Sequence, residues 1–296
     1  MNHIELFAGC GGLGVGMKSA GFNLVLANEI SPMASETFSY NLLQEDLTSN
    51  NTHHTFWLKS KYKKNDRLRL REDYREVMSL NNKDIYSDMP KSTDLKKIKG
   101  GLLIGSIQDL NSEIINNQKI CKEISNSFGD GRVDLVSGGP PCQSFSMAGL
   151  RDHGSEKNLL PWEFAKFCKS VKPRMVLLEN VTGILRAFKV NGKPHYAWFE
   201  VAKAFATKGC NYVPICLHIN AKSVGTAQNR PRFIMLCFEE DLAKKILLKG
   251  NLGPNGKEVF LKSIEFMKKM QNQNKHDYDP DFYYDLNKQH PLFDEW

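Results

Sequence analysis

One cysteine of the chain stands in a setting that favours chemistry. Cys142 ends the loop Gly138–Cys142, which directly follows the apolar run Val133–Val136. Two prolines fix backbone φ angles at the end of a predicted strand, which is where open α/β sheets place their sites. Gly, Pro, Gln and Ser neighbours also exclude regular burial in a sheet. We therefore interpret Cys142 as a nucleophile, and the other six cysteines as buried small hydrophobes.

A glycine-rich turn near the N-terminus predicts a nucleoside-binding loop. The stretch Gly9–Gly14 fits the pattern GxGxxG between the strand Ile4–Phe7 and a helix at Met17–Ala20. Glu29 lies about twenty residues further on, at the end of the next strand Asn23–Asn28, where a carboxylate can accept hydrogen bonds from ribose hydroxyls. The pattern fits a dinucleotide or S-adenosyl-L-methionine equally well, and glycines kept only for tight packing are the alternative.

Three further charged residues follow apolar runs or lie in unusual polar blocks. Glu179 ends the run Met175–Leu178 and is followed by Asn and Val, whereas a glutamate at a strand end is more often simply solvated. Arg232 closes the block Gln228–Arg232. Asp109 opens a predicted helix, where an acidic residue also complements the helix dipole.

The apolar runs around these residues predict one α/β fold. Strands are expected at the runs already named and at Leu102–Ile104, and a helix at Pro161–Lys169. Alternation of short strands with helices is typical of a doubly wound, mostly parallel sheet. The runs Tyr212–Ile219 and Phe233–Phe238 predict an antiparallel edge.

A polar segment interrupts this pattern at about residues 42–99. It is rich in Asn, Lys, Arg and His, with Trp57, Tyr62 and Tyr74 among the basic residues, and we treat it as an insertion. It would either contact phosphates or form a solvated, flexible loop. We expect a catalytic domain over residues 1–241, including this insertion, and assign residues 242–296 no independent fold.

Composition narrows the class of protein. The 296 residues are 41% hydrophobic, enough for a substantial core, and the net charge of +7 favours a polyanionic partner without requiring one. Seven cysteines form no CxxC pair and no metal-ligand spacing with histidine, so neither a zinc site nor a disulfide framework is indicated. The sequence has no signal peptide pattern or membrane-spanning run, and we expect a cytoplasmic protein.

Five blocks of the sequence resemble the C5-cytosine DNA methyltransferases. They are Phe7–Gly12, Glu29, Pro140–Gln143, Glu179–Val181 and Gln228–Arg232, in the order of that family. The resemblance covers about residues 1–41 and 101–238 and skips the insertion. It implies a Rossmann-like fold of class I S-adenosyl-L-methionine-dependent methyltransferases, with double-stranded DNA as the substrate.

The resemblance also implies roles for individual residues. Cys142 would add to C6 of a cytosine rotated out of the duplex, Glu179 would donate a proton at N3, and Arg232 would steady the base at O2. The implied contacts to S-adenosyl-L-methionine are Phe7, Gly9, Gly11, Gly12, Glu29, Asp109, Pro140 and Leu160. Pro140 and Leu160 would complete the adenosine pocket.

The sequence departs from the family after Arg232. We find neither a target-recognition domain nor the closing Gly-Asn-Ser-type motif, which leaves a split enzyme with a second subunit, a truncated product, or DNA contacts from the insertion. We favour the split enzyme. Rival functions are an RNA (tRNA) cytosine methyltransferase, a non-catalytic subunit, and a nicotinamide-dependent oxidoreductase, the last of which leaves the Pro-Pro-Cys loop unexplained.

Overall fold

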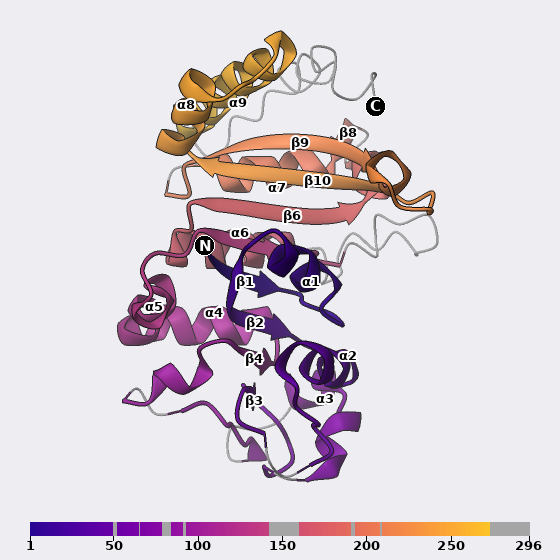
Figure 1. Ribbon diagram of the computed structural model, residues 1–296, viewed down its shortest axis with the longest axis vertical. Coiled ribbons are helices and arrows are strands. Elements are labelled where there is room, and N and C mark those ends of the chain that lie inside the picture. Colours follow the sequence, from indigo (N-terminus) through magenta and orange to yellow (C-terminus); the bar gives the residue numbers. More distant parts are fainter. Residues whose placement is uncertain are drawn as a thin grey trace. The chain divides into compact units, whose positions relative to one another are not determined.

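The computed structural model describes residues 1–49, 52–64, 66–78, 84–90, 93–141, 160–190, 193–207 and 209–272 (Figure 1). The chain divides into two compact units. The first comprises Met1–Gly139 and Lys166–Pro173, and the second comprises Pro140–Ala165 and Arg174–Trp296. In the part of the chain that the structure describes, no helix is long and apolar enough to cross a membrane.

Parallel strands form the centre of the first unit. They are β1 (Asn2–Leu6), β2 (Asn23–Glu29), β3 (Thr55–Trp57), β4 (Gly101–Ile104) and β5 (Leu135–Gly138). Their order is β3-β4-β2-β1-β5, and neighbouring strands in this order run parallel. Nearly all their residues are buried, as expected for strands covered on both faces. The strand order reverses at β1, so the loops after β1 and β5 leave the sheet side by side.

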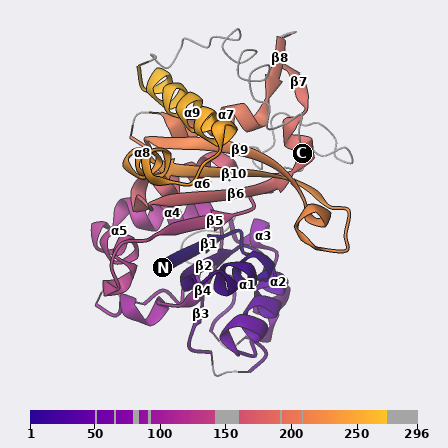
Figure 2. The ribbon, with the colours of Figure 1, turned by 45° about the horizontal axis from the view of Figure 1, so that its top comes forward.

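Helices flank these strands. They are α1 (Gly12–Ser19), α2 (Pro32–Phe38), α3 (Tyr74–Met78), α4 (Ile107–Asn116) and α5 (Gln118–Ser125). Figure 2 shows α1 and α2 on one side of the strands and α4 and α5 on the other. Side-chain oxygens of Ser31, Ser106 and Asn117 cap α2, α4 and α5, which fixes where these helices begin.

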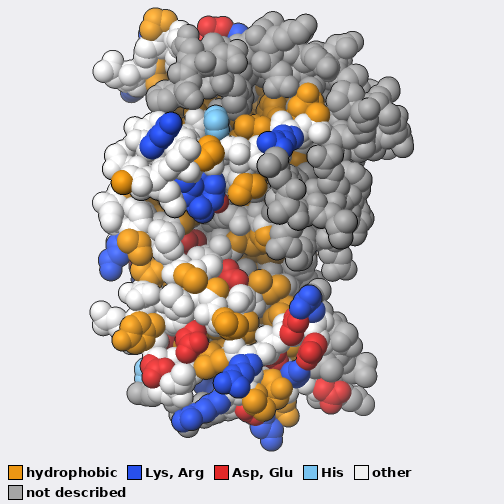
Figure 3. All heavy atoms as spheres, turned by 90° about the vertical axis from the view of Figure 1, so that its right-hand side faces the viewer, with side chains coloured by type: hydrophobic (Ala, Val, Ile, Leu, Met, Phe, Trp, Pro, Cys, Tyr) orange, Lys and Arg blue, Asp and Glu red, His pale blue; other side chains and the backbone are white. Residues whose placement is uncertain are grey.

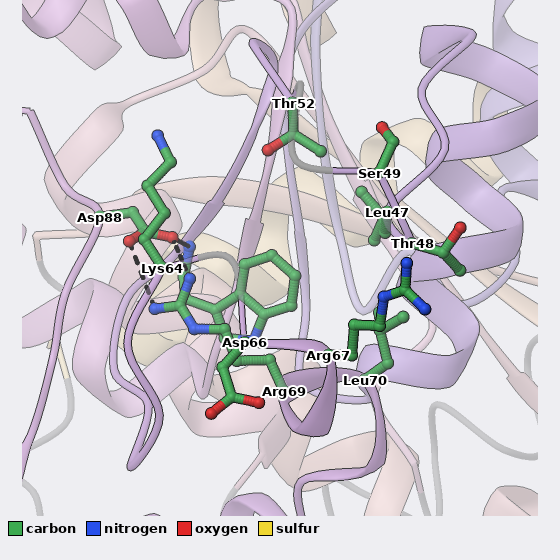
Figure 4. Close-up of a pocket in the computed structure, with 11 residues that line it drawn as sticks. Leu47, Thr48, Ser49, Thr52, Lys64, Asp66, Arg67, Arg69, Leu70 and Asp88 are labelled. Atoms are coloured by element: carbon green, nitrogen blue, oxygen red, sulfur yellow. Dashed lines mark hydrogen bonds and ion pairs between the residues drawn. The ribbon is translucent and has the colours of Figure 1, made fainter.

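The described part of segment 42–99 is packed against the sheet. It is therefore not a solvated loop, which was one of the two alternatives that the sequence allowed. Strand β3 extends the sheet beyond β4, and Trp57 and Tyr74 are buried. The 3-10 helix η2 (Arg67–Arg71) supplies Arg69, whose guanidinium bonds Asp88 at 2.6 and 3.3 Å and lies 4.7 Å from the Trp57 ring. Figure 4 shows Arg69 and Asp88 pointing toward one another.

Antiparallel strands form the centre of the second unit. In order they are β6 (Met175–Val181), β10 (Pro231–Glu239) and β9 (Tyr212–Asn220), so the predicted antiparallel edge is confirmed. Strands β7 (Ala187–Val190) and β8 (Lys193–Tyr196) form a separate hairpin. With the parallel strands of the first unit, these pairings confirm an α/β fold of mostly parallel pairing with an antiparallel edge.

Helices of the second unit include three that the sequence did not predict. Helix α6 (Leu160–Val171) matches the expected helix, and its residues divide between the units. Helix α7 (Ala197–Ala206) and helix α9 (Pro254–Asn272) both pack on β9, and α8 (Glu240–Lys249) precedes α9. Phe260, Phe266 and Met267 of α9 are buried. Helices α8 and α9 were not predicted, because their apolar stripe is diluted by Lys and Asn, and they pack on β9 rather than forming a fold of their own.

Candidate active site

The loop after β1 has the sharp backbone turn that its glycines predict. Gly9 and Gly11 adopt φ angles of 56° and 88°, and Phe7 adopts 54°, a region that residues with a Cβ seldom enter. Backbone bonds from Ala8 N to Asn28 O at 3.0 Å and from Gly11 N to Ala8 O at 2.9 Å hold the turn against β2. Strain retained beside the glycines is typical of a functional site.

The carboxylate of Glu29 ties this loop to the end of β2. Its Oε2 accepts from Gly9 N at 2.7 Å and its Oε1 from Ser31 N at 2.8 Å. The residue is 8% exposed. Because each carboxylate oxygen has two acceptor positions, one on each oxygen stays available for a further donor such as a hydroxyl. The two residues predicted to contact a nucleoside thus lie in direct contact with one another.

The glycines of the loop differ in what they accommodate. A Cβ built on Gly9 or Gly12 would meet nothing within 4 Å, so a ligand can approach the backbone there. A Cβ on Gly11 would lie 2.4 Å from Leu42 Cδ1, so packing alone requires glycine at this position. The open space at Gly9 and Gly12, together with the free acceptor positions of Glu29, fits a nucleoside cofactor.

Asp109 lies in the first turn of α4, which follows β4, the strand next to β2 and Glu29. Ser106 caps α4 and donates from its Oγ to Asp109 Oδ2 at 2.8 Å. Lys59 Nζ lies 2.7 Å from Asp109 Oδ1, and the hydroxyl of Tyr74 donates to Oδ2. Two side chains of the insertion therefore hold a residue that the sequence places in the cofactor site.

Glu5 is a residue of this region that the sequence interpretation missed. It is 1% exposed, and its Oε1 accepts from Gly14 N at 3.0 Å at the beginning of α1. A Cβ on Gly14 would lie 2.4 Å from Glu5 Oε2, which explains why α1 begins within the glycine stretch rather than at Met17. Burial, followed by the nearby charge of Glu29, raises the pKa of Glu5 to about 7. A charged residue inside an apolar strand was the available signal.

Glu179 and Arg232 meet on one face of the second unit. Strand β10 pairs with β6 so that Arg232 stands opposite Val181, two residues from Glu179 on the same face. Arg232 Nε lies 2.6 Å from Glu179 Oε1, and Arg232 Nη1 donates to Pro231 O at 2.9 Å. The two side chains are partly exposed, at 21% for Arg232 and 33% for Glu179, although Arg232 Nε itself is buried.

Asn180 links β6 to the loop that carries the predicted nucleophile. Its Nδ2 donates to Pro140 O at 3.0 Å, and its Oδ1 accepts from Val181 N at 2.8 Å. At 4% exposure it lies on the opposite face of β6 from Glu179. Pro140 is buried, whereas Cys142 lies outside the described residues. The sequence interpretation gave Asn180 no role of its own, whereas the structure shows its hydrogen bond to Pro140 in this loop.

The structure also places Leu160 and Cys10. Leu160 is the first residue of α6 and is half-buried. Cys10, interpreted from sequence as a buried small hydrophobe, is exposed in the loop after β1, so that interpretation was wrong. The turn that opens the loop to a ligand also keeps its one thiol outside the core.

The first unit has the architecture of a Rossmann-like nucleotide-binding protein: parallel strands, a glycine turn after β1 and an acidic residue at the end of β2. A more specific assignment comes from comparison with known proteins. A family model described as C-5 cytosine-specific DNA methylase matches residues 1–70 and 105–294, and the chain belongs to this family.

Individual relatives are similar over much of the chain. Type II methyltransferase M.DdeI of Desulfomicrobium norvegicum is 30% identical over 83% of this chain and 43% of its own length. Type II methyltransferase M.NgoPII of Neisseria gonorrhoeae is 28% identical over 89% of this chain and 56% of its own. The chain thus spans about half the length of the curated relatives it matches. A solved DNA modification methyltransferase encoded within an E. coli prophage is 22% identical with a TM-score of 0.48, over 82% of this chain and 47% of that one.

Proposed function

We propose that this chain is the catalytic part of an enzyme that transfers a methyl group from S-adenosyl-L-methionine to C5 of cytosine in DNA. Membership of the family supports the class of reaction. The observation that carries the proposal is the partly exposed Glu179–Arg232 pair, on the strand whose next residue, Asn180, bonds the loop leading to Cys142. An acid, a cation and a loop for a nucleophile are the groups that addition to a pyrimidine needs.

The cofactor would bind at the carboxyl ends of β1, β2 and β4. Backbone at Gly9 and Gly12 would face its methionine portion, and Glu29 would accept from its ribose hydroxyls. The remaining proposed contacts are Phe7, Gly11, Asp109, Pro140 and Leu160. S-adenosyl-L-methionine supplies an electrophilic methyl group.

Cys142 would activate the base, because cytosine C5 is a poor nucleophile. Its thiolate adds to C6, the C5–C6 electron pair becomes available at C5, and negative charge spreads toward N3. After methylation, a base held in the site removes the C5 proton, and the bond between sulfur and C6 breaks. The target must leave the base stack to reach these groups, as a flipped nucleotide does.

Glu179 and Arg232 would stabilise the charge that this addition creates. To donate at N3, Glu179 would have to carry a proton there. Arg232, which pairs with Glu179 in the structure, would move toward O2 of the base. The two side chains would then contact neighbouring positions of one ring, and the ion pair between them would be their arrangement before DNA binds.

Phosphate contacts are proposed for the basic surface of segment 42–99. Lys63, Lys64, Arg67 and Arg71 are exposed, and Leu68 beside them is 51% exposed. Figure 3 shows basic and hydrophobic side chains interleaved, with acidic ones nearby, in the part where Figure 1 places α2 and α3. Such a mixed surface suits contacts to the DNA backbone, which fix position without reading sequence.

Target recognition is proposed to come from beyond these catalytic elements, on a second polypeptide. The relatives are about twice as long as the part of them that this chain matches, which supports a further recognition element on this or another chain. Base-edge contacts need an element that enters a groove.

The proposal is tested by methyl transfer from labelled S-adenosyl-L-methionine to duplex DNA and to tRNA. The chain should be assayed alone and mixed with the product of any neighbouring methyltransferase-like gene. We expect 5-methylcytosine in DNA, strongest in the mixture. Label in tRNA alone would support the rival RNA activity, and full sequence-specific activity of this chain alone would remove the second polypeptide.

A further inference from the structure

The carboxylate of Asp109 is surrounded by donors from two parts of the sequence. Ser106 comes from the same helix, whereas Lys59 and Tyr74 come from segment 42–99. Tyr74 is 4% exposed, so its hydroxyl has no access to bulk water as a substitute partner. The family model matches residues 1–70 and 105–294, so Lys59 lies within the matched part of the chain and Tyr74 outside it.

Counting acceptor positions shows what these contacts leave open. A carboxylate has about four lone-pair positions, two on each oxygen. Ser106 and Tyr74 both donate to Oδ2, and Lys59 contacts Oδ1, so one position on Oδ1 remains. The ammonium group of Lys59 and the two hydroxyl groups all act as donors, so the Asp109 carboxylate serves as an acceptor at each of these contacts.

Two residues that donate to Asp109, Ser106 and Tyr74, are themselves held in place. Ser106 Oγ accepts from Asp109 N at 3.0 Å while its hydroxyl donates to Asp109, so the cap and the carboxylate orient one another. Burial and the neighbouring Asp109 raise the pKa of the Tyr74 phenol, which keeps its proton available for donation. The arrangement is therefore a rigid acceptor.

The open position lies beside the proposed cofactor site. Ile104, at the end of β4, stands opposite Glu29 of β2, and Gly105 N donates to Glu29 O at 2.9 Å. Leu58 packs closely on Gly105, because a Cβ built on Gly105 would lie 2.8 Å from the Cβ of Leu58. The segment that supplies Lys59 and Tyr74 thus covers the end of the strand next to Glu29.

We propose that Lys59 and Tyr74 are positioning residues that hold the Asp109 carboxylate as an acceptor with one open position, and so make the site select a 6-amino over a 6-oxo purine. This inference rests on the proposed function, because it takes the adenosine of the cofactor as the ligand. The amine of adenine donates to the open position. A carbonyl at the same place brings two acceptors together and is rejected.

The test compares two ligands that differ at purine position 6 and, as a consequence, at N1, which is an acceptor in adenine and a donor in hypoxanthine. Dissociation constants of S-adenosylhomocysteine and S-inosylhomocysteine are measured by calorimetry on the full chain and on Lys59→Met and Tyr74→Phe. The wild type should prefer the adenosyl ligand about 10- to 100-fold, the range of one charged hydrogen bond. Each variant should reduce that preference several-fold, since the released carboxylate can turn away or take up a proton.

Matched variants separate positioning from general damage. Lys61→Met removes a lysine of the same segment that pairs with Glu76 instead, and it should keep the wild-type preference. Lys59→Arg should restore most of it. If Lys59→Met and Tyr74→Phe weaken both ligands equally, or change neither, the inference is overturned while the proposed function stands. If the wild type binds neither ligand, both fail.

Discussion

Replacing Glu5 by glutamine should stabilise the chain at neutral pH, and the gain should disappear in acid. Glu5 is buried, and its pKa rises from 4.5 to about 7 on folding. Between these values the folded state binds a proton that the unfolded state has lost, so wild-type stability falls as pH rises through that window. The shift corresponds to about 3 kcal/mol of stability, which is fully present below pH 4.5 and is lost as the pH rises through 7. Glutamine stays neutral throughout and can still accept from Gly14 N.

Urea unfolding of wild type and Glu5→Gln at pH 5, 6, 7 and 8 measures this effect. The difference in unfolding free energy should move by about 3 kcal/mol in favour of the variant over this range. His3 has the opposite slope, because burial lowers its pKa to about 4, but it is present in both proteins and cancels. A difference that stays flat from pH 5 to pH 8 would refute the reasoning.

Two further predictions concern segment 42–99. Asp88→Asn should lower the unfolding free energy by about 3–5 kcal/mol, because Arg69 would remain buried without its counter-charge. The double variant Arg69→Met/Asp88→Leu, which replaces both charges by apolar side chains, should restore the stability if this is the cause. The double variant Arg67→Gln/Arg71→Gln should reduce the slope of log affinity for DNA against log salt concentration by about 1.8. The control Arg75→Gln, which removes an arginine already paired with Asp73, should leave the slope unchanged. Equal slopes in the wild type and in both variants would exclude phosphate contacts by Arg67 and Arg71.

The regular part of the fold was predictable because its physical signals are local. Parallel strands buried on both faces read as continuous apolar runs, and β1, β2 and β4 were found within a few residues of their observed ends. Strand β6, whose residues alternate between buried and half-buried, was found as well. Segment 42–99 was not predictable in this way. Its order depends on a buried ion pair, Arg69–Asp88, and on β3 joining the sheet edge, and both are contacts between residues far apart in sequence.

Some contacts of the candidate site were likewise predictable from local sequence, and others were not. Gly9 and Glu29 were linked by motif spacing, and the structure shows them bonded. The roles of Glu5 and Asn180 depend on what each side chain faces, Gly14 N and Pro140 O, and a single sequence does not encode such a pairing in any spacing. The hold of Lys59 and Tyr74 on Asp109 is of the same kind.

The most direct measurement is covalent trapping on duplex DNA that contains 5-fluorocytosine, with S-adenosyl-L-methionine present and the complex resolved under denaturing conditions. Fluorine cannot leave as a proton does, so the bond between sulfur and C6 would persist. The account predicts an adduct with the wild type and with Cys10→Ser, whose exposed thiol serves as the control, and none with Cys142→Ser. An adduct that survives in Cys142→Ser, or its absence from the wild type, would contradict the central claim.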